Sequence, residues 1–187
     1  MRIAISGSQC VGKSTLMKVL ANDPYFKSFT FLEEVVRSLI RTGVKINKDA
    51  DHYSQCAILE RHYWNTLINN RYFTDRCSVD AFVYGTYNYL QGKFTYSEHK
   101  EHERLFLSSV RSYDHHFYLP PLAFLEEDGV RDTDLAYQTE IDRLSNILQT
   151  FNDRYGTEFE DADKVRQMAE NIANDVAKNN ELINSIK

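Results

Sequence analysis

An eight-residue segment near the N-terminus limits the folds open to this chain more than any other part of it. The segment follows a short apolar run, 2–6, precedes a stretch of helical spacing, 14–20, and matches G-x-x-x-x-G-K-[ST] without a departure. Its glycines let the backbone curl so that N–H groups converge on phosphate oxygens, and the following helix adds its positive end. The segment therefore predicts a strand, a phosphate-binding loop and a helix, in that order.

The same segment predicts which residues hold a nucleotide. The Lys13 side chain would contact the β- and γ-phosphates, and the Ser14 hydroxyl would ligate Mg²⁺. The expected nucleotide-binding residues are Gly7, Ser8, Gln9, Cys10, Val11, Gly12, Lys13, Ser14 and Thr15.

Apolar runs of strand length alternate with segments of helical spacing along the rest of the chain. The expected strands are 2–6, 29–32, 72–74, 116–119 and, at an edge, 157–160. The expected helices are 14–20, 35–42, 51–70, 79–90, 97–112, one ending near 155, and one from about 163. Strands joined by such long crossovers form a parallel sheet with helices on both faces. The predicted fold is a three-layer α/β sandwich with a mostly parallel five-stranded sheet.

Composition is consistent with a single domain, residues 1–187. Hydrophobic residues make up 42% of the 187 residues and the charges are interspersed, which excludes disorder as the main state. The net charge of −5 disfavours nucleic acid as a partner without excluding it. No apolar stretch approaches the roughly 18 residues of a membrane span, so no membrane partner is expected.

The three cysteines, Cys10, Cys56 and Cys77, are far apart and show no C-x-x-C spacing. This pattern fits neither a disulfide framework nor a zinc site, and it is typical of a reducing compartment. The expected location is the cytoplasm, or the host cytoplasm if the protein is viral. A homodimer is compatible with these features.

Two classes of phosphate-loop protein lack support in the sequence. A GTP-binding switch carries an N-K-x-D box, whereas residues 47–50 read N-K-D-A and lack the final Asp. A ring-forming ATPase motor carries a paired Asp-Glu after its second acidic strand, whereas Asp75 is followed by Arg76. A small kinase remains.

Four segments, spread over residues 1 to about 150, carry a family resemblance. They are the loop 7–14, Glu34-Val35-Val36-Arg37, Asp75-Arg76, and Leu119-Pro120-Pro121 followed by Asp128-Gly129-Val130-Arg131. With them the chain resembles the P-loop nucleoside and nucleotide kinases, relatives of thymidylate kinase and deoxynucleoside kinase. It is most similar to the ATPase/kinase domain family that includes bacterial nicotinamide riboside kinase. The resemblance implies a P-loop kinase sheet, ATP and Mg²⁺ as cofactors, and a lid at about 120–137.

The charged residues after the second strand suit an acceptor site. Phosphoryl transfer needs a carboxylate near the attacking hydroxyl, and ligands gather at the carboxyl ends of parallel strands. Glu34 is the candidate base, and its neighbour Glu33 is the alternative, because the sequence does not say which side chain faces the cleft. Either acid would also suit the positive end of a helix. Arg37, on the same helical side as Glu34, would orient that carboxylate, contact substrate or form a structural ion pair.

Asp75 would hold Mg²⁺ through water, and Arg76 would grip a phosphate as a rigid fork, unless the two form a surface ion pair. By resemblance they are the kinase Asp-Arg motif, and Arg131 is the lid arginine that covers the transferred group, unless its segment is a solvated acidic loop. The predicted catalytic residues are thus Lys13, Glu34, Asp75, Arg76 and Arg131. The predicted substrate-binding residues are Glu33, Arg37 and Arg76, and the predicted metal ligands are Ser14 and Asp75.

The predicted activity is ATP-dependent transfer of the γ-phosphoryl group to a hydroxyl of a nucleoside-like small molecule. One alternative is a nucleoside monophosphate kinase, for which cations would come from Arg37, Arg41 and Arg76. Another is a kinase acting on a hydroxymethylated base in DNA, for which a basic face would have to form from Lys93, Lys100, Arg104 and Arg111. A third is a non-catalytic nucleotide-binding protein.

Overall fold

The computed structural model describes residues 1–9, 11–32, 34–119 and 134–152 of the chain. The elements in chain order are β1 (Arg2–Ser6), α1 (Lys13–Asn22), η1 (Pro24–Phe26), β2 (Thr30–Leu32), α2 (Val35–Ile40), η2 (Asn47–Asp49), α3 (His52–Ile68), β3 (Tyr72–Asp75), α4 (Ser78–Leu90), α5 (Tyr96–Val110), β4 (His115–Tyr118) and α6 (Leu135–Asn152). The expected edge strand at 157–160, the terminal helix from about 163 and most of the lid lie outside the described residues.

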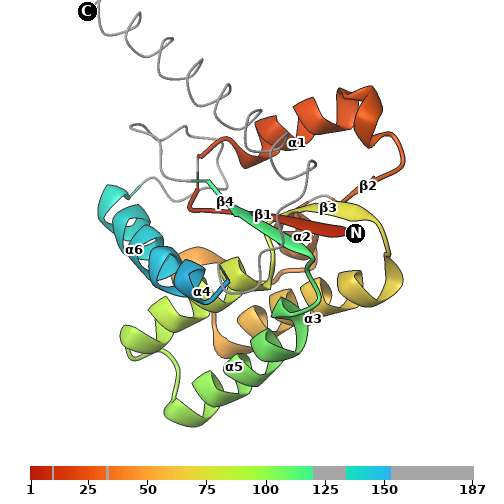
Figure 1. The fold of residues 1–187 in the computed structure, drawn as a ribbon. Helices are drawn as coiled ribbons and strands as arrows, with labels where there is room; N and C mark the ends of the chain where they lie inside the picture. The colour runs from red at the N-terminus through yellow and green to blue at the C-terminus, as the bar shows by residue number, and fades with distance from the viewer. Residues whose placement is uncertain (10, 33, 120–133, 153–187) are drawn as a thin grey trace, which may run out of the picture.

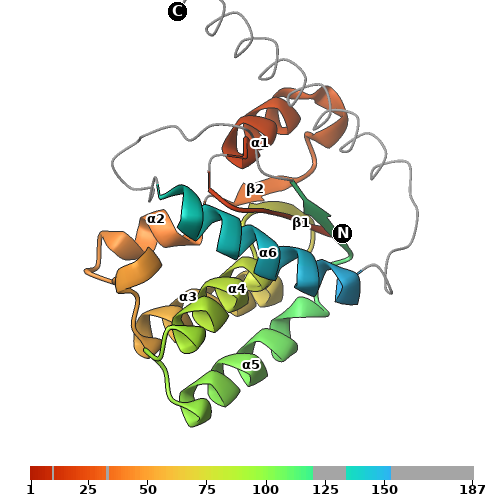
Figure 2. The same ribbon diagram turned by 90° about the vertical axis from the view of Figure 1, so that its left-hand side faces the viewer.

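The four described strands form one parallel sheet in the order β2-β3-β1-β4. Strand β1 is central, and its Ile3 is in register with Phe73 of β3 and with His115 of β4. Helix α1 covers one face of the sheet, while α3, α4 and α6 lie on the other (Figures 1 and 2). These layers confirm the predicted three-layer α/β sandwich.

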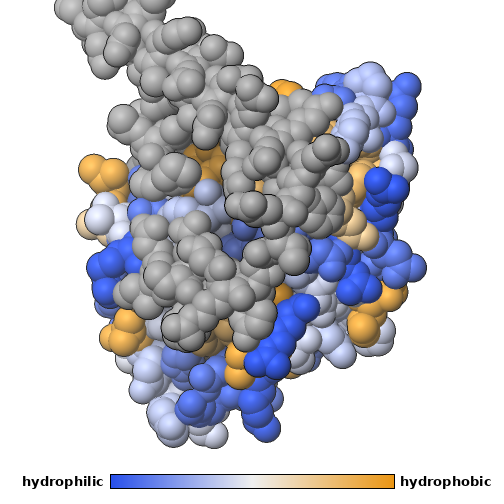
Figure 3. All heavy atoms as spheres, viewed as in Figure 1, coloured by the Kyte–Doolittle hydropathy of each residue, from blue (hydrophilic) through white to orange (hydrophobic). Residues whose placement is uncertain are grey.

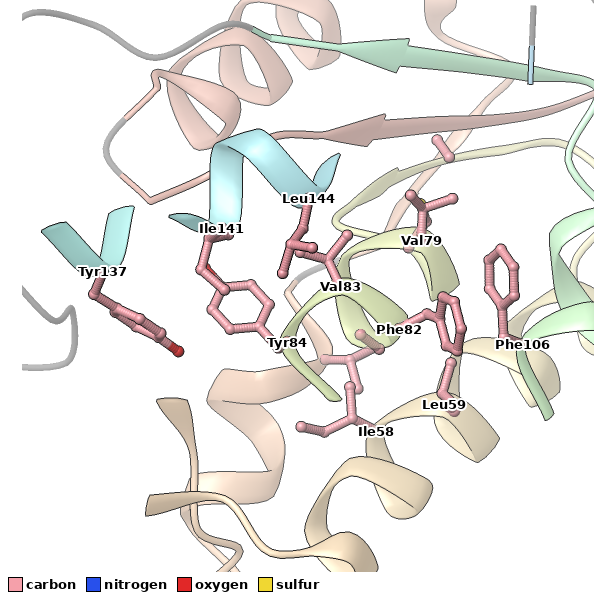
Figure 4. Close-up of a cluster of buried hydrophobic side chains, with 14 residues drawn as sticks. Ile58, Leu59, Val79, Phe82, Val83, Tyr84, Phe106, Tyr137, Ile141 and Leu144 are labelled. Carbon is pink, nitrogen blue, oxygen red and sulfur yellow. The ribbon is translucent and has the colours of Figure 1, made fainter. Parts of the chain in front are cut away.

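The alternation of side chains along β1 divides the core into two clusters. Ile3 and Ile5 join the cluster on the α1 side, together with Leu16 and Phe73. Ala4 points to the opposite face and joins the larger cluster of the helical layer. In that layer α4 lies between α6 on one side and α3 and α5 on the other (Figure 4). Helix α4 is therefore fixed by packing on several sides.

Side-chain caps set where three of these helices begin. Asp51 caps α3 by accepting a hydrogen bond from the Ser54 N–H at 2.9 Å. Helices α4 and α5 each begin with a reciprocal capping box, in which the third helical residue is acidic: Asp80 in α4 and Glu98 in α5. Such boxes satisfy backbone N–H groups that the first helical turn leaves without partners. The start of α4, directly after β3, is thus tightly defined.

The outer surface is mixed in character. On the face shown in Figure 3, apolar residues lie as separate spots among hydrophilic ones. Lys100, Arg104 and Arg111 are exposed on or just after α5, which lies on the side of the molecule opposite α1 (Figures 1 and 2), and Lys93 is exposed on the connection that leads into α5. The basic face that the sequence left open therefore does not surround the phosphate loop. None of the helices in the described ranges is both long and apolar enough to span a bilayer.

Candidate active site

The phosphate loop (residues 7–14) connects the carboxyl end of β1 to α1, as predicted. Gly7 and Gly12 have φ angles of 139° and 85°, a region that side-chain-bearing residues rarely adopt. A Cβ at Gly7 would also lie 2.5 Å from the carbonyl oxygen of Leu119. The backbone at Gly7 is thus pressed against the end of β4, and only glycine fits there. Cys10 lies outside the described residues.

Lys13 is the first residue of α1, and its side chain turns back over the loop. Its Nζ atom donates hydrogen bonds to the carbonyl oxygens of Gly7 at 2.9 Å and Ser8 at 2.5 Å. Burial, helped by the charge of Arg76, lowers the pKa of Lys13 to about 8, although nearby carboxylates oppose the shift. The Lys13 ammonium is therefore still mostly protonated at neutral pH.

Ser14 and Asp75 meet at the junction of the loop and β3. The Ser14 hydroxyl donates a 2.7 Å hydrogen bond to Oδ2 of Asp75, which is in register with Ile5 of β1. The other carboxylate oxygen, Oδ1, is buried and has no hydrogen-bond partner in the described ranges. Burial raises the pKa of Asp75 above its ordinary value, although Lys13 and Ser14 oppose the shift.

The Ser14 hydroxyl and the Asp75 carboxylate fit Mg²⁺. Mg²⁺ is a hard cation that often takes only one or two protein ligands and completes its coordination shell with water and phosphate oxygens. The buried Oδ1 atom of Asp75 has no hydrogen-bond partner in the described part of the chain, so it is available to bind the cation or a water molecule of its shell. No cluster of three or more His, Cys, Asp or Glu side chains that could hold a metal occurs among the residues that the structure describes. An all-protein metal cage is therefore not what these residues build.

Arg76 has an unusual backbone conformation that aims its side chain. Its φ angle is 71°, in the left-handed region that is uncommon for residues other than glycine. Its N–H donates to the Ile5 carbonyl oxygen at 2.9 Å, and the Thr74 hydroxyl donates to its carbonyl oxygen at 2.9 Å. These bonds hold the turn after β3 and direct the guanidinium toward Glu34.

Glu34 is bound by two arginines. Its Oε1 accepts a hydrogen bond from Nε of Arg76 at 2.7 Å, and its Oε2 accepts one from Nε of Arg37 at 3.0 Å. Glu34 occupies the N-cap position of α2 but makes no side-chain capping bond, so its carboxylate is used elsewhere. Burial raises the pKa of Glu34, but Arg76, with Lys13 and Arg37, outweighs burial and holds the pKa below its usual value. Glu34 is therefore ionised at neutral pH.

Three side chains for which the sequence predicted no role bind the phosphate loop from the helical layer. Asp80 of α4 accepts a hydrogen bond from the Gly7 N–H at 3.1 Å. Tyr84, also of α4, donates its hydroxyl to Oε1 of Gln9 at 2.9 Å. Gln138 of α6 donates from Nε2 to the backbone carbonyl oxygen of Gln9 at 2.9 Å. The loop is thus held by the helical layer as well as by β1 and α1.

Only one of these contacts has a local sequence signal. Asp80 stands three residues after Cys77, which is the spacing of a capping box, but Cys is not a usual N-cap residue and the signal is weak. Tyr84 and Gln138 reach the loop through the packing of α4 and α6. No pattern in the linear sequence predicts that packing.

The structure gathers most of the predicted site residues at the carboxyl ends of β1 and β3. Lys13, Ser14, Glu34, Asp75 and Arg76 lie together there, and the charges of the other three ionisable groups all act on Lys13. Thr15 lies on α1 and is exposed. Glu33 and Arg131 lie outside the described residues, so their predicted roles stay predictions.

Solved structures of low sequence identity share this fold. The structure of a deoxyadenosine kinase from M. mycoides, with products dcmp and a flexible dcdp bound, has a TM-score of 0.64 at 17% identity, and the match covers 100% of both chains. The same kinase with bound dATP has a TM-score of 0.60 at 16% identity, over 95% of this chain and 99% of that one. The NadR protein in complex with NR has a TM-score of 0.62 at 19% identity, and the match covers 80% of this chain but only 42% of the NadR chain.

A search of curated proteins found no match. A family model described as AAA domain matches residues 2–170, which is most of the chain. That description names a domain and no reaction, so the expectation that this is not a ring-forming ATPase motor stays a prediction. Because the family model covers most of the chain, the chain belongs to the AAA domain family, and it shares its fold with the deoxyadenosine kinase and NadR structures.

Proposed function

We propose that this protein is a Mg²⁺- and ATP-dependent phosphotransferase that moves the γ-phosphoryl group of ATP to a hydroxyl of a nucleoside-like small molecule. The proposal is carried by the ionised Glu34 carboxylate, which Arg76 holds at the end of the sheet where Lys13 and Asp75 also lie. A nucleoside-like acceptor is supported by the shared fold with a deoxyadenosine kinase and with a protein solved with NR.

The donor half of the site consists of the phosphate loop, Lys13, Ser14 and Asp75. Loop N–H groups and the Lys13 ammonium would bind the phosphates, with Lys13 exchanging the carbonyl oxygens of Gly7 and Ser8 for phosphate oxygens. Mg²⁺, when bound by Ser14 and Asp75, would neutralise charge on the phosphates. Arg131 would cover the transferred group, as the resemblance implies.

The acceptor half favours a neutral hydroxyl over a phosphate. Arg76 and Arg37, two of the three arginines that a phosphate acceptor would need, are both bound to Glu34. Nη1 of Arg76 also lies 3.6 Å from Oδ1 of Asp80. Around the site, the cations Lys13, Arg37 and Arg76 are matched by three carboxylates, those of Glu34, Asp75 and Asp80. Among these six described side chains the positive and negative charges balance, which favours an uncharged hydroxyl acceptor over a dianionic one.

The lowered pKa of Glu34 suits this chemistry. A carboxylate of low pKa is a weak base, but it accepts a hydrogen bond from a hydroxyl at neutral pH and orients the attacking oxygen. Because the transition state of phosphoryl transfer is loose, positioning and charge stabilisation contribute more than early proton removal. Glu34, held by Arg76 and Arg37, would therefore act mainly by alignment.

A small molecule is favoured over a DNA strand for an electrostatic reason. Binding a polymer backbone needs Lys and Arg over several phosphates, and the exposed Lys100, Arg104 and Arg111 lie away from the phosphate loop. Lys100 is moreover paired with Glu103 at 2.5 Å.

The cytoplasm, where ATP and nucleosides are available, is the proposed location, in keeping with the free Cys56 and Cys77.

A substrate panel with γ-labelled ATP and Mg²⁺ tests the proposal. The panel contains nucleosides, deoxynucleosides, nicotinamide riboside, nucleoside monophosphates and base-hydroxymethylated DNA. We expect labelled phosphate on one or more free nucleosides. Label on monophosphates alone would indicate a nucleoside monophosphate kinase, and nucleotide binding without transfer to any acceptor would indicate a non-catalytic protein.

A further inference from the structure

Asp80 lies where the donor and acceptor halves of the site meet. Its Oδ1 accepts a hydrogen bond from the Gly7 N–H at 3.1 Å and lies 3.6 Å from Nη1 of Arg76. Its Oδ2 accepts a hydrogen bond from the Cys77 N–H at 2.9 Å. The side chain is only 6% exposed. One buried carboxylate thus contacts both the first residue of the phosphate loop and the arginine that holds Glu34.

Tyr84 makes a similar pair of contacts one helical turn later. Its hydroxyl donates to Oε1 of Gln9 at 2.9 Å and accepts a 3.5 Å hydrogen bond from Nη1 of Arg76. The guanidinium carbon of Arg76 lies 5.4 Å from the centre of the Tyr84 ring. Residues four apart share one face of a helix. Helix α4 therefore presents Asp80 and Tyr84 to the loop and to Arg76 at once.

Helix capping alone does not account for Asp80. Glu98 closes the capping box of α5 in the same way, by accepting a hydrogen bond from the Thr95 N–H at 2.7 Å at an exposed site, and Glu98 itself is only partly buried. A capping acid therefore has no need of full burial. Burying a carboxylate is unfavourable unless hydrogen bonds and an opposite charge compensate for it. For Asp80, Gly7 and Arg76 supply that compensation, and both belong to the site.

We propose that Asp80 and Tyr84 are positioning residues that hold the phosphate loop and the Arg76–Glu34 pair in one rigid arrangement. The inference rests on the proposed function, because it concerns the alignment of a bound nucleotide with the Glu34 carboxylate. Phosphoryl transfer depends on that alignment, and a displacement of about 1 Å can lower a rate by about 100-fold. The core packing of α4 supplies the rigidity (Figure 4).

Two nearly isosteric substitutions separate this role from a role in folding. Asp80→Asn keeps one oxygen for Gly7 but removes the charge that faces Arg76 and turns an amide toward the Cys77 N–H. Tyr84→Phe removes only the hydroxyl. The matched controls are Glu98→Gln, in the capping box of α5, and Tyr72→Phe, which removes a buried hydroxyl without a hydrogen-bond partner in the described ranges.

The measurement is the Kd for Mg²⁺·AMP-PNP at a temperature well below the melting temperature of every variant. We expect the Kd to rise by about 10-fold or more in Asp80→Asn and by a smaller factor in Tyr84→Phe, while both controls bind as the wild type does. Wild-type affinity in both α4 variants would overturn the inference, and so would affinity losses that follow melting temperature across all four. If Asp80→Asn does not fold, the comparison of Tyr84→Phe with Tyr72→Phe decides.

The same experiment separates this inference from the proposed function. A wild-type protein that binds Mg²⁺·AMP-PNP but phosphorylates no acceptor contradicts the proposed function alone, and the affinities still decide the role of Asp80 and Tyr84. A wild-type protein that binds no nucleotide overturns both.

Discussion

Nε of Arg76 donates a 2.7 Å hydrogen bond to Oε1 of Glu34, across 42 residues of sequence. The two side chains are only 12% and 17% exposed, so solvent screens this ion pair less than it screens a surface pair. Removing one partner leaves the other as a partly buried charge with fewer compensating contacts, which is unfavourable. The pair thus connects the start of α2 to the end of β3, on the side of the site where we propose that the acceptor binds.

Replacing Glu34 by Gln should separate its chemical role from binding. The amide keeps the shape of the side chain but loses the charge that orients a hydroxyl, so we expect turnover to fall by roughly 10²–10⁴-fold with ATP affinity little changed. Steady-state kinetics and a nucleotide titration check this. The same substitution at Glu33 is the control. If only the Glu33 variant loses activity, the carboxylate that orients the acceptor hydroxyl is Glu33, and if neither does, neither of these carboxylates has that role.

Lys13→Met should slow transfer by about 100-fold or more without unfolding the protein. The ammonium is expected to stabilise charge on the transferring phosphoryl group, so its loss should cost about 3 kcal/mol or more in the activation free energy. Because burial lowers the pKa of Lys13, holding its charge inside the protein is unfavourable, and the melting temperature should not fall. Turnover and thermal melting are measured together. Wild-type turnover in this variant would rule out the proposed phosphate site.

The pKa of Lys13, lowered to about 8, predicts how nucleotide affinity depends on pH. The side chain is cationic below that pKa and loses its charge as the pH rises through it, so affinity for Mg²⁺·AMP-PNP should decline above about pH 8. Lys13→Arg keeps its charge throughout this range and should give a flat profile. Titrations between pH 7 and 9.5 compare the two proteins. A flat wild-type profile would show that Lys13 does not bind the phosphates in this way.

Stability should fall in acid because two buried histidines are neutral in the folded protein. Burial lowers the pKa of His62 to about 4, and burial, with neighbouring histidines, lowers the pKa of His102 to about 3, from an ordinary 6.5. Their stabilising contribution is complete above pH 6.5 and is lost as the pH falls from 6.5 toward these folded-state values. Each histidine should therefore lower the free energy of unfolding by about 2 kcal/mol between pH 7 and pH 5.

Urea unfolding at pH 7 and pH 5 measures this loss. The His102 ring packs closely against Gly85, where a Cβ would lie 2.0 Å from it, so the ring cannot be displaced toward α4 on protonation. A His102→Asn variant should be less stable at pH 7 but should lose less stability between the two pH values. Equal losses in the variant and the wild type would contradict the assignment to His102.

The sequence predicted the donor half of the site better than its surroundings. The loop at 7–14 and Asp75 are local patterns at the ends of strands, and parallel pairing of β1 with β3 necessarily brings Ser14 close to Asp75. The i, i+3 spacing likewise predicted that Arg37 lies beside Glu34. A local pattern suffices for the arginine, and a local pattern with one rule of sheet topology suffices for the loop and Asp75.

The helical contacts to the loop could not be predicted in this way. Asp80 and Gln138 reach Gly7 and Gln9 across separations of 73 and 129 residues, and these contacts depend on how α4 and α6 pack over the sheet. The left-handed turn at Arg76, which aims its guanidinium, also has no signal in an Asp-Arg pair. Both features arise from tertiary packing, which single-residue spacing does not encode.

The product of the reaction with γ-labelled ATP tests most simply whether this protein is a kinase for small hydroxyl acceptors. With Mg²⁺ and free nucleosides, we predict a labelled phosphomonoester whose rate of formation falls by about 100-fold or more in both Lys13→Met and Glu34→Gln. Label found only in a diphosphate or only in base-hydroxymethylated DNA would contradict this prediction. So would the absence of label from every acceptor while the protein binds Mg²⁺·AMP-PNP.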